Sequence, residues 1–280
     1  MMNVELLVNT IKSMVDSETT VTSNVVQKSN VTLTGISIGK DSVIPTVYVE
    51  NYEDLYESDG YEAVAREMIN LCESVRIPNF STESIMTLDY AKKNLQLCVE
   101  PKGINKNYVT IPYLDLELYF RVKVSNEGTY RVKREMLSAW GITKVDLLDI
   151  VEETNEYIVS SMKEMMIQLM IDDGTPEYVI NSIREDNNPD QTVVTNKYKL
   201  FGASAIYNKE ILKEVADKYK SDLYILPSSI HEILLIPISI GDKKEIDSMV
   251  REVNETQVDP QEVLSNHAYI FRRDTMEIYW

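Results

Sequence analysis

The stretch Lys220-Ser-Asp-Leu-Tyr-Ile-Leu-Pro-Ser-Ser-Ile-His-Glu-Ile-Leu-Leu-Ile-Pro237 decides how the C-terminal part of this chain folds. It contains two short apolar runs, residues 223–226 and 233–236, separated by a Pro-Ser-Ser segment. Short apolar runs bounded by proline and serine are typical of buried β-strands. We therefore predict two neighbouring strands, with the polar residues between them at a turn or at the start of the second strand.

The segments before and after these two strands are predicted to add further strands and helices. Upstream, residues 198–206 are predicted as a strand, and Asn208 as the cap of a helix. Downstream, Asp242-Lys-Lys-Glu245 resembles a capping box, followed by apolar residues at helical spacing up to Val253. Short helical and hairpin segments are predicted from Asp259 and over 268–280. The resulting β-α-β-β-α-β order is that of a split βαβ unit, which predicts helices packed on one face of a mostly antiparallel sheet.

The N-terminal part also mixes strands and helices, so the predicted fold class is α+β. Residues 22–27 and 31–38 predict a hairpin around Ser29-Asn30, and Tyr61 begins an amphipathic helical pattern. Thr143 is a predicted helix cap. We expect an N-terminal lobe over 1–155, a helical Met-rich connector over 156–190 and a C-terminal lobe over 191–280, with an exposed loop at 184–190.

Composition limits the kinds of partner. The 280 residues are 44% hydrophobic, enough for a large core, and carry a net charge of −17. Such a charge argues against binding to nucleic-acid phosphates or to an anionic membrane, because both need Lys and Arg side chains. Two cysteines in apolar surroundings suggest reduced thiols, and neither a secretory signal nor a membrane-spanning run is visible. We expect a cytoplasmic protein whose partner has a basic surface.

Three polar residues near the second strand supply the side-chain types of a hydrolase. Ser229, His231 and Glu232 correspond to a nucleophile, a base and an orienting acid. Residues two apart on a strand share a face, so the first two side chains are able to approach each other. No G-x-S-x-G elbow accompanies them, and the alternative is a structural turn in which the serine caps and the histidine is satisfied by the backbone.

Other sites have weaker patterns. The two histidines and two cysteines have no zinc-ligand spacing, and Asp172-Asp173-Gly174 is too short for a calcium loop. Neither glycine-rich nucleotide motif is present. We therefore predict no metal and no cofactor.

Two acidic regions are candidates for partner binding. Residues 50–73 contain eight carboxylates against a single arginine, and residues 146–173 contain eight more against one lysine. The first region supplies the predicted partner-binding residues Glu53, Asp54, Glu57 and Glu62. The alternative is a solvated helix face on an acidic protein. The methionines at 162, 165, 166 and 170 are interpreted as core residues in preference to an adaptable binding groove.

Several phrases resemble a known bacterial family of unknown function. They include Pro45-Thr-Val-Tyr-Val-Glu50, Gly202-Ala-Ser-Ala-Ile-Tyr207 and Ile225-Leu-Pro-Ser-Ser-Ile-His-Glu232, and the resemblance extends from about Val4 to Phe271. This family is common in gut Firmicutes and occurs on their integrative and conjugative elements. The resemblance implies a cytoplasmic bacterial protein often carried by mobile elements, and it transfers no site residue.

Two function classes remain open from the sequence. The first is a non-enzymatic interaction protein of a bacterial mobile element, which uses its acidic surface to inhibit a nucleic-acid-binding host protein. The second is a hydrolase that uses Ser229 and His231. A cleft that brings these two side chains together near backbone donors is the feature that distinguishes them.

Overall fold

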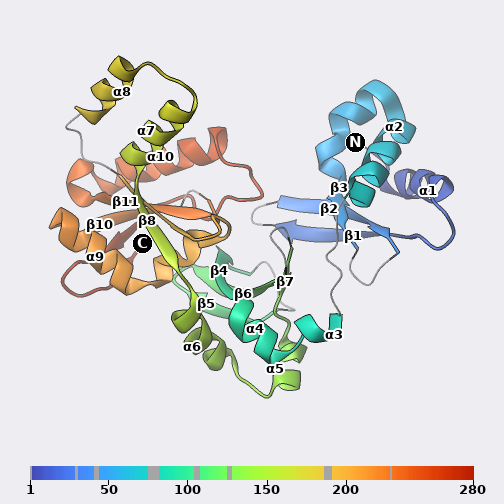
Figure 1. Cartoon of the computed structure of the whole chain (residues 1–280), viewed down its shortest axis with the longest axis horizontal. Helices are drawn as coiled ribbons and strands as arrows, with labels where there is room; N and C mark the ends of the chain where they lie inside the picture. Colours follow the sequence, from blue (N-terminus) through green and yellow to red (C-terminus); the bar gives the residue numbers. More distant parts are fainter. Residues whose placement is uncertain are drawn as a thin grey trace. The chain divides into compact units, whose positions relative to one another are not determined.

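The computed structural model describes residues 2–28, 31–40, 44–74, 82–103, 108–124, 128–185, 191–227 and 229–280. The chain divides into two compact units, Met1–Thr87 and Leu88–Trp280 (Figure 1). The fold is α+β with antiparallel sheets, as predicted. The predicted turn at Ser29-Asn30 and residues 186–190 of the predicted loop lie outside the described residues.

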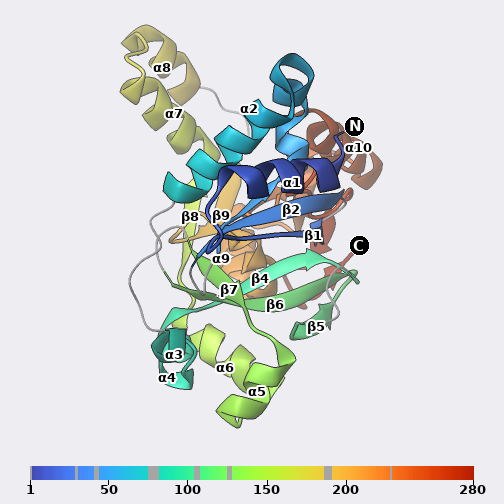
Figure 2. The ribbon, with the colours of Figure 1, turned by 90° about the vertical axis from the view of Figure 1, so that its right-hand side faces the viewer.

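The first unit is a three-stranded antiparallel sheet covered by two helices. Its elements are α1 (Val4–Met14), β1 (Thr20–Lys28), β2 (Val31–Gly39), β3 (Thr46–Tyr48), the 3-10 helix η1 (Val49–Tyr52), α2 (Glu53–Ser74) and the short α3 (Thr82–Ile85). Helices α1 and α2 lie on the same side of the β1-β2-β3 sheet (Figure 2). Their apolar stripes meet Ile36 and Ile38 of β2 through Leu7, Ile11 and Met68, which are all buried.

Helix α2 begins earlier than the sequence pattern indicates. The apolar spacing starts at Tyr61, but the helix starts at Glu53 and is interrupted at Gly60, whose φ is 75° and ψ is −170°. Glycine adopts this backbone conformation without the steric cost that a Cβ atom brings. The kink separates a polar first part of α2 from a second part that packs on the sheet through Val64, Ala65 and Met68.

The second unit contains two sheets that share one hydrophobic core. Its first elements are α4 (Leu88–Asn94), β4 (Leu95–Pro101), β5 (Thr110–Tyr113), β6 (Leu116–Lys123), β7 (Thr129–Arg131), α5 (Arg134–Trp140) and α6 (Lys144–Thr154). These strands form a sheet in the order β4-β6-β5, with β7 also paired to β6. The alternating apolar residues of β4 and β6, such as Leu97 and Phe120, enter the core shared with the larger sheet.

The larger sheet has six strands in the order β13-β12-β10-β11-β9-β8. The remaining elements are β8 (Tyr157–Ser161), α7 (Met162–Asp172), α8 (Glu177–Arg184), β9 (Thr192–Asn196), η2 (Gly202–Tyr207), α9 (Lys209–Tyr219), β10 (Leu223–Leu226), β11 (Glu232–Pro237), η3 (Ile238–Ile240), α10 (Lys243–Thr256), β12 (Tyr269–Phe271) and β13 (Ile278–Tyr279). The order β9-α9-β10-β11-α10-β12 confirms the predicted β-α-β-β-α-β unit, and neighbouring strands are antiparallel. The caps predicted at Thr143, Asn208 and Asp242 also accept hydrogen bonds from their helices.

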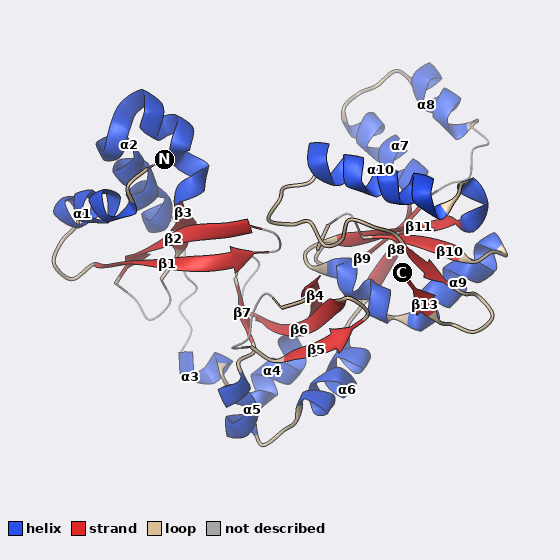
Figure 3. Ribbon diagram, turned by 180° about the vertical axis from the view of Figure 1, so that it is seen from behind, coloured by secondary structure: helices blue, strands red, loops and turns tan. Residues whose placement is uncertain are grey.

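The two helices of this unit do not share one face of the sheet, which corrects the prediction. Alternate residues of a strand point to opposite faces. Leu223 and Ile225 of β10 belong to the core that contains α9, whereas Tyr224 and Leu226 pack with Ile246 and Val250 of α10. Helices α9 and α10 therefore cover opposite faces (Figure 3). The physical reason is that β9→β10 and β11→β12 cross over in the same direction along the sheet from antiparallel starting strands, so two right-handed crossovers place their helices on opposite sides.

The predicted strand over 198–206 is also wrong. The strand next to β11 is β9, and the small residues that follow form the buried 3-10 helix η2. A Cβ atom at Gly202 would lie 2.4 Å from the Asn196 nitrogen and 2.7 Å from the His231 carbonyl oxygen. The close approach of η2 to two strands therefore requires glycine there. The helix predicted from Asp259 is instead a turn, closed by a hydrogen bond from the Glu262 N–H to the Asp259 carbonyl.

The compact units differ from the three predicted lobes. Strand β8 (Tyr157–Ser161), which was assigned to a helical connector, pairs with β9 along its whole length. This pairing makes the segment part of the larger sheet. The division of the chain lies instead between Thr87 and Leu88.

Candidate functional site

Ser229 and His231 lie close together, but the histidine ring does not contact the serine hydroxyl. The Ser229 hydroxyl donates to Glu232 Oε1 at 2.8 Å and accepts from the backbone N–H of His231 at 3.0 Å. Ser229 is buried, and its backbone forms a β-bridge with Val263. The serine therefore closes the turn before β11, which is a structural use of a hydroxyl.

The His231 ring is occupied on both nitrogens. Nδ1 accepts the backbone N–H of Phe201 at 3.2 Å, and Nε2 lies 3.1 Å from Glu262 Oε1. An Nδ1 that accepts leaves the proton of the neutral ring on Nε2, where it is donated to the carboxylate. The ring therefore ties η2 to the turn at Glu262, and Ser229, His231 and Glu232 do not form a nucleophile–base–acid chain. A general base must reach the proton of its nucleophile, and this ring does not.

The four predicted partner-binding residues all lie on α2, at or beyond its first turn. We call Glu53, Asp54, Glu57 and Glu62 the acidic segment of α2. Glu53 and Glu57 are one helical turn apart, and Asp54 is exposed beside them. Glu62 follows the Gly60 kink and pairs with Arg66 at 3.3 Å. The structure thus brings three carboxylates together, and separates the fourth from them by the kink.

The methionine-rich helix is not part of the core, contrary to the sequence interpretation. Among the described side chains of α7, none is buried, and Met165, Met166 and Leu169 are all exposed. Helix α7 packs against α8, and the two helices form an insertion between the adjacent strands β8 and β9 (Figure 1). Helical spacing of apolar residues predicts a helix, but periodicity alone does not show whether its apolar side chains are buried in a core.

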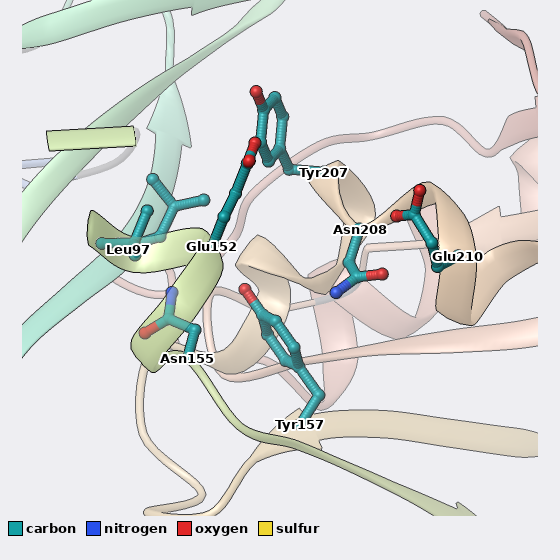
Figure 4. A pocket seen from close by; sticks show the side chains of 8 residues that line it. Leu97, Glu152, Asn155, Tyr157, Tyr207, Asn208 and Glu210 are labelled. Atoms are coloured by element: carbon teal, nitrogen blue, oxygen red, sulfur yellow. The ribbon is translucent and has the colours of Figure 1, made fainter. Parts of the chain in front are cut away.

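A pocket of about 360 Å³ opens between α6, the start of β8 and the junction of η2 with α9 (Figure 4). Its polar lining consists of two tyrosines, two glutamates and two asparagines: Tyr157, Tyr207, Glu152, Glu210, Asn155 and Asn208. Its apolar lining is Leu97 and Val151. The volume is at the lower end of the range for small-molecule sites, roughly 300–1,000 Å³.

The two tyrosine rings of the pocket are held in place. The Tyr157 hydroxyl lies 3.1 Å from the Ser204 hydroxyl, and burial raises the pKa of Tyr157 to about 12. The Tyr207 ring packs edge-on against Tyr113 with ring centroids 5.3 Å apart. Burial, followed by the charges of Glu152 and Asp149, raises the pKa of Tyr207.

Sequence reasoning missed the pocket, because its residues come from three separate stretches of the chain, at Leu97, 151–157 and 207–210. Figure 4 shows Glu152 reaching beside the ring of Tyr207, while Glu210 extends from the first turn of α9. The Asn208 carbonyl oxygen of the side chain accepts from the Ile211 N–H at 3.0 Å, so it caps α9. The sequence indicated only the Asn208 cap, which predicts where the helix begins but not which segments lie beside it.

A buried ion pair on the smaller sheet was also missed. Arg131 makes two hydrogen bonds to Glu100, at 3.0 and 2.6 Å, and its guanidinium lies 4.0 Å from the Tyr119 ring centroid. Burial raises the pKa of the neighbouring Cys98 thiol to about 12, and both cysteines are free and buried. Such a thiol is protonated at neutral pH and is a poor nucleophile. These contacts fasten β4 to β7 across β6.

A second histidine joins the two sheets of the same unit. His267 Nε2 lies 2.9 Å from Asp115 Oδ2, and the Tyr269 hydroxyl donates to Asp115 Oδ1 at 2.6 Å. Asp115 follows Leu114, which has a φ of 56°, in the turn between β5 and β6. Burial opposes ionisation, but the hydrogen bonds from Tyr269 and His267 outweigh it and lower the pKa of Asp115. The cluster is a structural tie between the β5–β6 turn and β12.

The described part of the chain contains neither a metal-ligand cluster nor a membrane-spanning helix. There, no group of three or more His, Cys, Asp or Glu side chains is placed to hold a metal ion. Among the helices described, none combines the length and the apolar character needed to cross a membrane.

Comparison with known proteins gives a family but no activity. No curated protein and no solved structure matches the chain. The sequence model of one family, described as a family of unknown function (DUF5688), matches residues 3–273. This match covers both compact units, so the chain belongs to the DUF5688 family of unknown function.

Proposed function

We propose that this protein is a non-enzymatic interaction factor that binds a protein partner with a basic surface through the acidic segment of α2. The observation that carries the proposal is the arrangement of Glu53, Asp54 and Glu57 on adjacent turns of one helix. Among the described residues, no ion pair to these three side chains is formed. Like charges at such spacing repel one another, so a cationic partner surface would relieve an unfavourable interaction.

The role is placed in a bacterial mobile element. The resemblance to a family found on integrative and conjugative elements supports this setting, and the net charge of −17 supports a partner that normally holds nucleic acid. An acidic protein that occupies such a partner's basic surface would inhibit it. The hydrogen bonds of Ser229 and His231 disfavour the hydrolase alternative, since both groups already have structural partners.

The test is capture of partners from host lysate at low and moderate salt. A variant with Lys at all four positions of the acidic segment is compared with the wild type. A matched control reverses four exposed carboxylates of the second unit, at Glu153, Glu214, Glu252 and Glu255. We expect the wild type and the control to retain the same basic proteins at low salt, and the acidic-segment variant to lose them.

Recovery of the same partners by all three proteins at both salt levels would reject the proposal. Turnover of an ester or peptide panel that disappears in Ser229→Ala and His231→Gln would establish the hydrolase alternative in its place.

A further inference from the structure

We infer that the pocket between α6 and α9 binds an organic cation, that is, an alkylammonium or guanidinium group on a short methylene stem. This inference concerns the second unit and does not depend on the acidic segment of α2. It rests on the charge, the aromatic rings and the apolar floor of one pocket.

The charged side chains that line the pocket favour a cationic ligand. Glu152 from α6 and Glu210 from α9 both line the pocket, and among the described residues of its lining none is Lys, Arg or His. The charge of Asp149 also acts on Tyr207. Both glutamates are exposed, so each attracts a cation as strongly as an exposed ion pair does, and the two charges act together on one ligand. An anionic ligand would be repelled by the same carboxylates.

The start of α9 does not reverse this preference. A helix N-terminus ordinarily favours anions. Here the Asn208 side chain already caps the helix, and Glu210 supplies a negative charge in the first turn. The N–H group of Ile211 in the first turn is therefore already satisfied by the protein itself.

The rings and the apolar residues define the shape of the ligand. Tyr157 and Tyr207 are fixed by contacts to Ser204 and Tyr113, so both rings stay in the lining of the pocket without a large ordering cost. A cation within about 6 Å of such a ring is attracted by its electron-rich face. Leu97 and Val151 suit methylene groups, which pack on apolar surface while the charged end remains near polar groups.

Such a cation has two sources, a free small molecule or the Lys or Arg side chain of a protein. The volume of about 360 Å³ accommodates one such group and does not distinguish the sources. The shared chemistry is therefore tested first, and the source is tested by comparing a free probe with a peptide.

The experiment is an NMR titration of the full chain with ¹³C-labelled tyrosine rings. The probes are butylguanidinium and its uncharged isostere butylurea, followed by a Gly-Gly-Arg-Gly-Gly peptide and the same peptide with citrulline. The signals of Tyr157 and Tyr207 are assigned by substitution of each with Phe. We expect butylguanidinium to shift both signals saturably and butylurea to leave them unchanged. Tighter binding of the arginine peptide would assign a protein source, and tighter binding of butylguanidinium a small molecule.

Three variants decide whether the carboxylates are responsible. Glu152→Gln and Glu210→Gln each remove one lining charge without changing the side-chain shape. Glu153→Gln removes an exposed charge beside the first of these positions and outside the lining. We expect the first two to weaken binding by roughly tenfold and the third to leave it unchanged.

Equal shifts with butylguanidinium and butylurea, or equal affinity in all three variants, would overturn the inference. These variants lie outside α2, so a result that overturns the cation site would not affect the proposed function. Loss of partner capture in the acidic-segment variant likewise says nothing about this pocket.

Discussion

At the residue scale, each of the two histidines contacts segments that are distant in the sequence: His231 contacts Phe201 and Glu262, and His267 contacts Asp115. His231 was grouped with Ser229 because the two are neighbours on a strand, a spacing that a catalytic pair and a satisfied turn share. In the structure, the backbone N–H of Phe201, 30 residues away, donates to the His231 ring. This contact favours the satisfied turn over the catalytic pair. No local pattern reports such a distant partner.

His231→Gln is expected to lower the free energy of unfolding by about 1 kcal/mol, because it weakens the hydrogen bond from the Phe201 N–H. Urea unfolding of the variant and of Glu214→Gln, an exposed control, measures the difference. Any catalytic activity should be unaffected. Unchanged stability of the His231 variant would contradict the structural role of the ring.

Asp115 makes stability depend on pH at the acidic end. Its pKa is lowered in the folded state by Tyr269 and His267, against the effect of burial. A carboxylate with a depressed folded pKa stabilises the fold above its unfolded pKa, and this contribution is lost as pH falls through the folded value. Asp115→Asn should therefore reduce stability at pH near 6 by about 1 kcal/mol, kept small by partial exposure.

The difference between the wild type and Asp115→Asn should shrink as the pH is lowered below the ordinary Asp pKa of about 4, because the unfolded wild type then takes up a proton that the folded protein does not. It should be lost once the pH falls through the lowered pKa of the folded protein. Urea unfolding at several pH values measures it, with Glu255→Gln as an exposed control. A difference that stays constant down to the lowest pH would show that the carboxylate charge is not what Tyr269 and His267 stabilise.

At the scale of single elements, the sequence was informative where the signal was local. The cap at Asp242 and the apolar residues after it predicted α10, because both lie within the helix that they define. The strand predicted over 198–206 failed for the opposite reason. Residues 202–205 are small and buried, and at Gly202 the close approach of Asn196 and His231 leaves no room for a Cβ atom.

Val250 tests the register of α10. It is 2% exposed and packs with Tyr224 and Leu226, whereas its neighbour Met249 is 44% exposed. Val250→Asp should bury an unpaired carboxylate, cost several kcal/mol and unfold at least the second unit. Met249→Asp, one residue away on the exposed side, should cost less than about 0.5 kcal/mol.

Thermal unfolding followed by circular dichroism compares these two variants with the wild type. Similar losses of stability in both would mean that α10 is rotated from the position described. A large loss confined to Val250→Asp would agree with the packing of α10 on the face of the larger sheet opposite α9.

At the scale of the whole molecule, fold class was predictable and the division of the chain was not. Alternating and helical periodicities both occur throughout, which is sufficient for α+β. The predicted connector over 156–190 missed a non-local pairing: β8 joins β9 although α7 and α8 separate them in the sequence. The pocket between α6 and α9 depends on the same long-range assembly, so its six polar residues gave no joint signal.

The distribution of charge is the feature of the whole molecule on which the proposed function depends. A net charge of −17 produces a field that acts on any basic partner, whereas the acidic segment of α2 is one defined place within that field. Charge reversal at a contact slows association and reduces its salt dependence, and reversal elsewhere has a smaller effect on both. This distinction separates a binding surface from general acidity.

The most direct measurement is therefore the association rate of a captured basic partner at increasing salt. It is made with the wild type, the acidic-segment variant and the four-residue control in the second unit. We expect a rate that falls steeply with salt for the wild type and the control, and a slower, less salt-dependent rate for the acidic-segment variant. The same rate and the same salt dependence in all three proteins would contradict it.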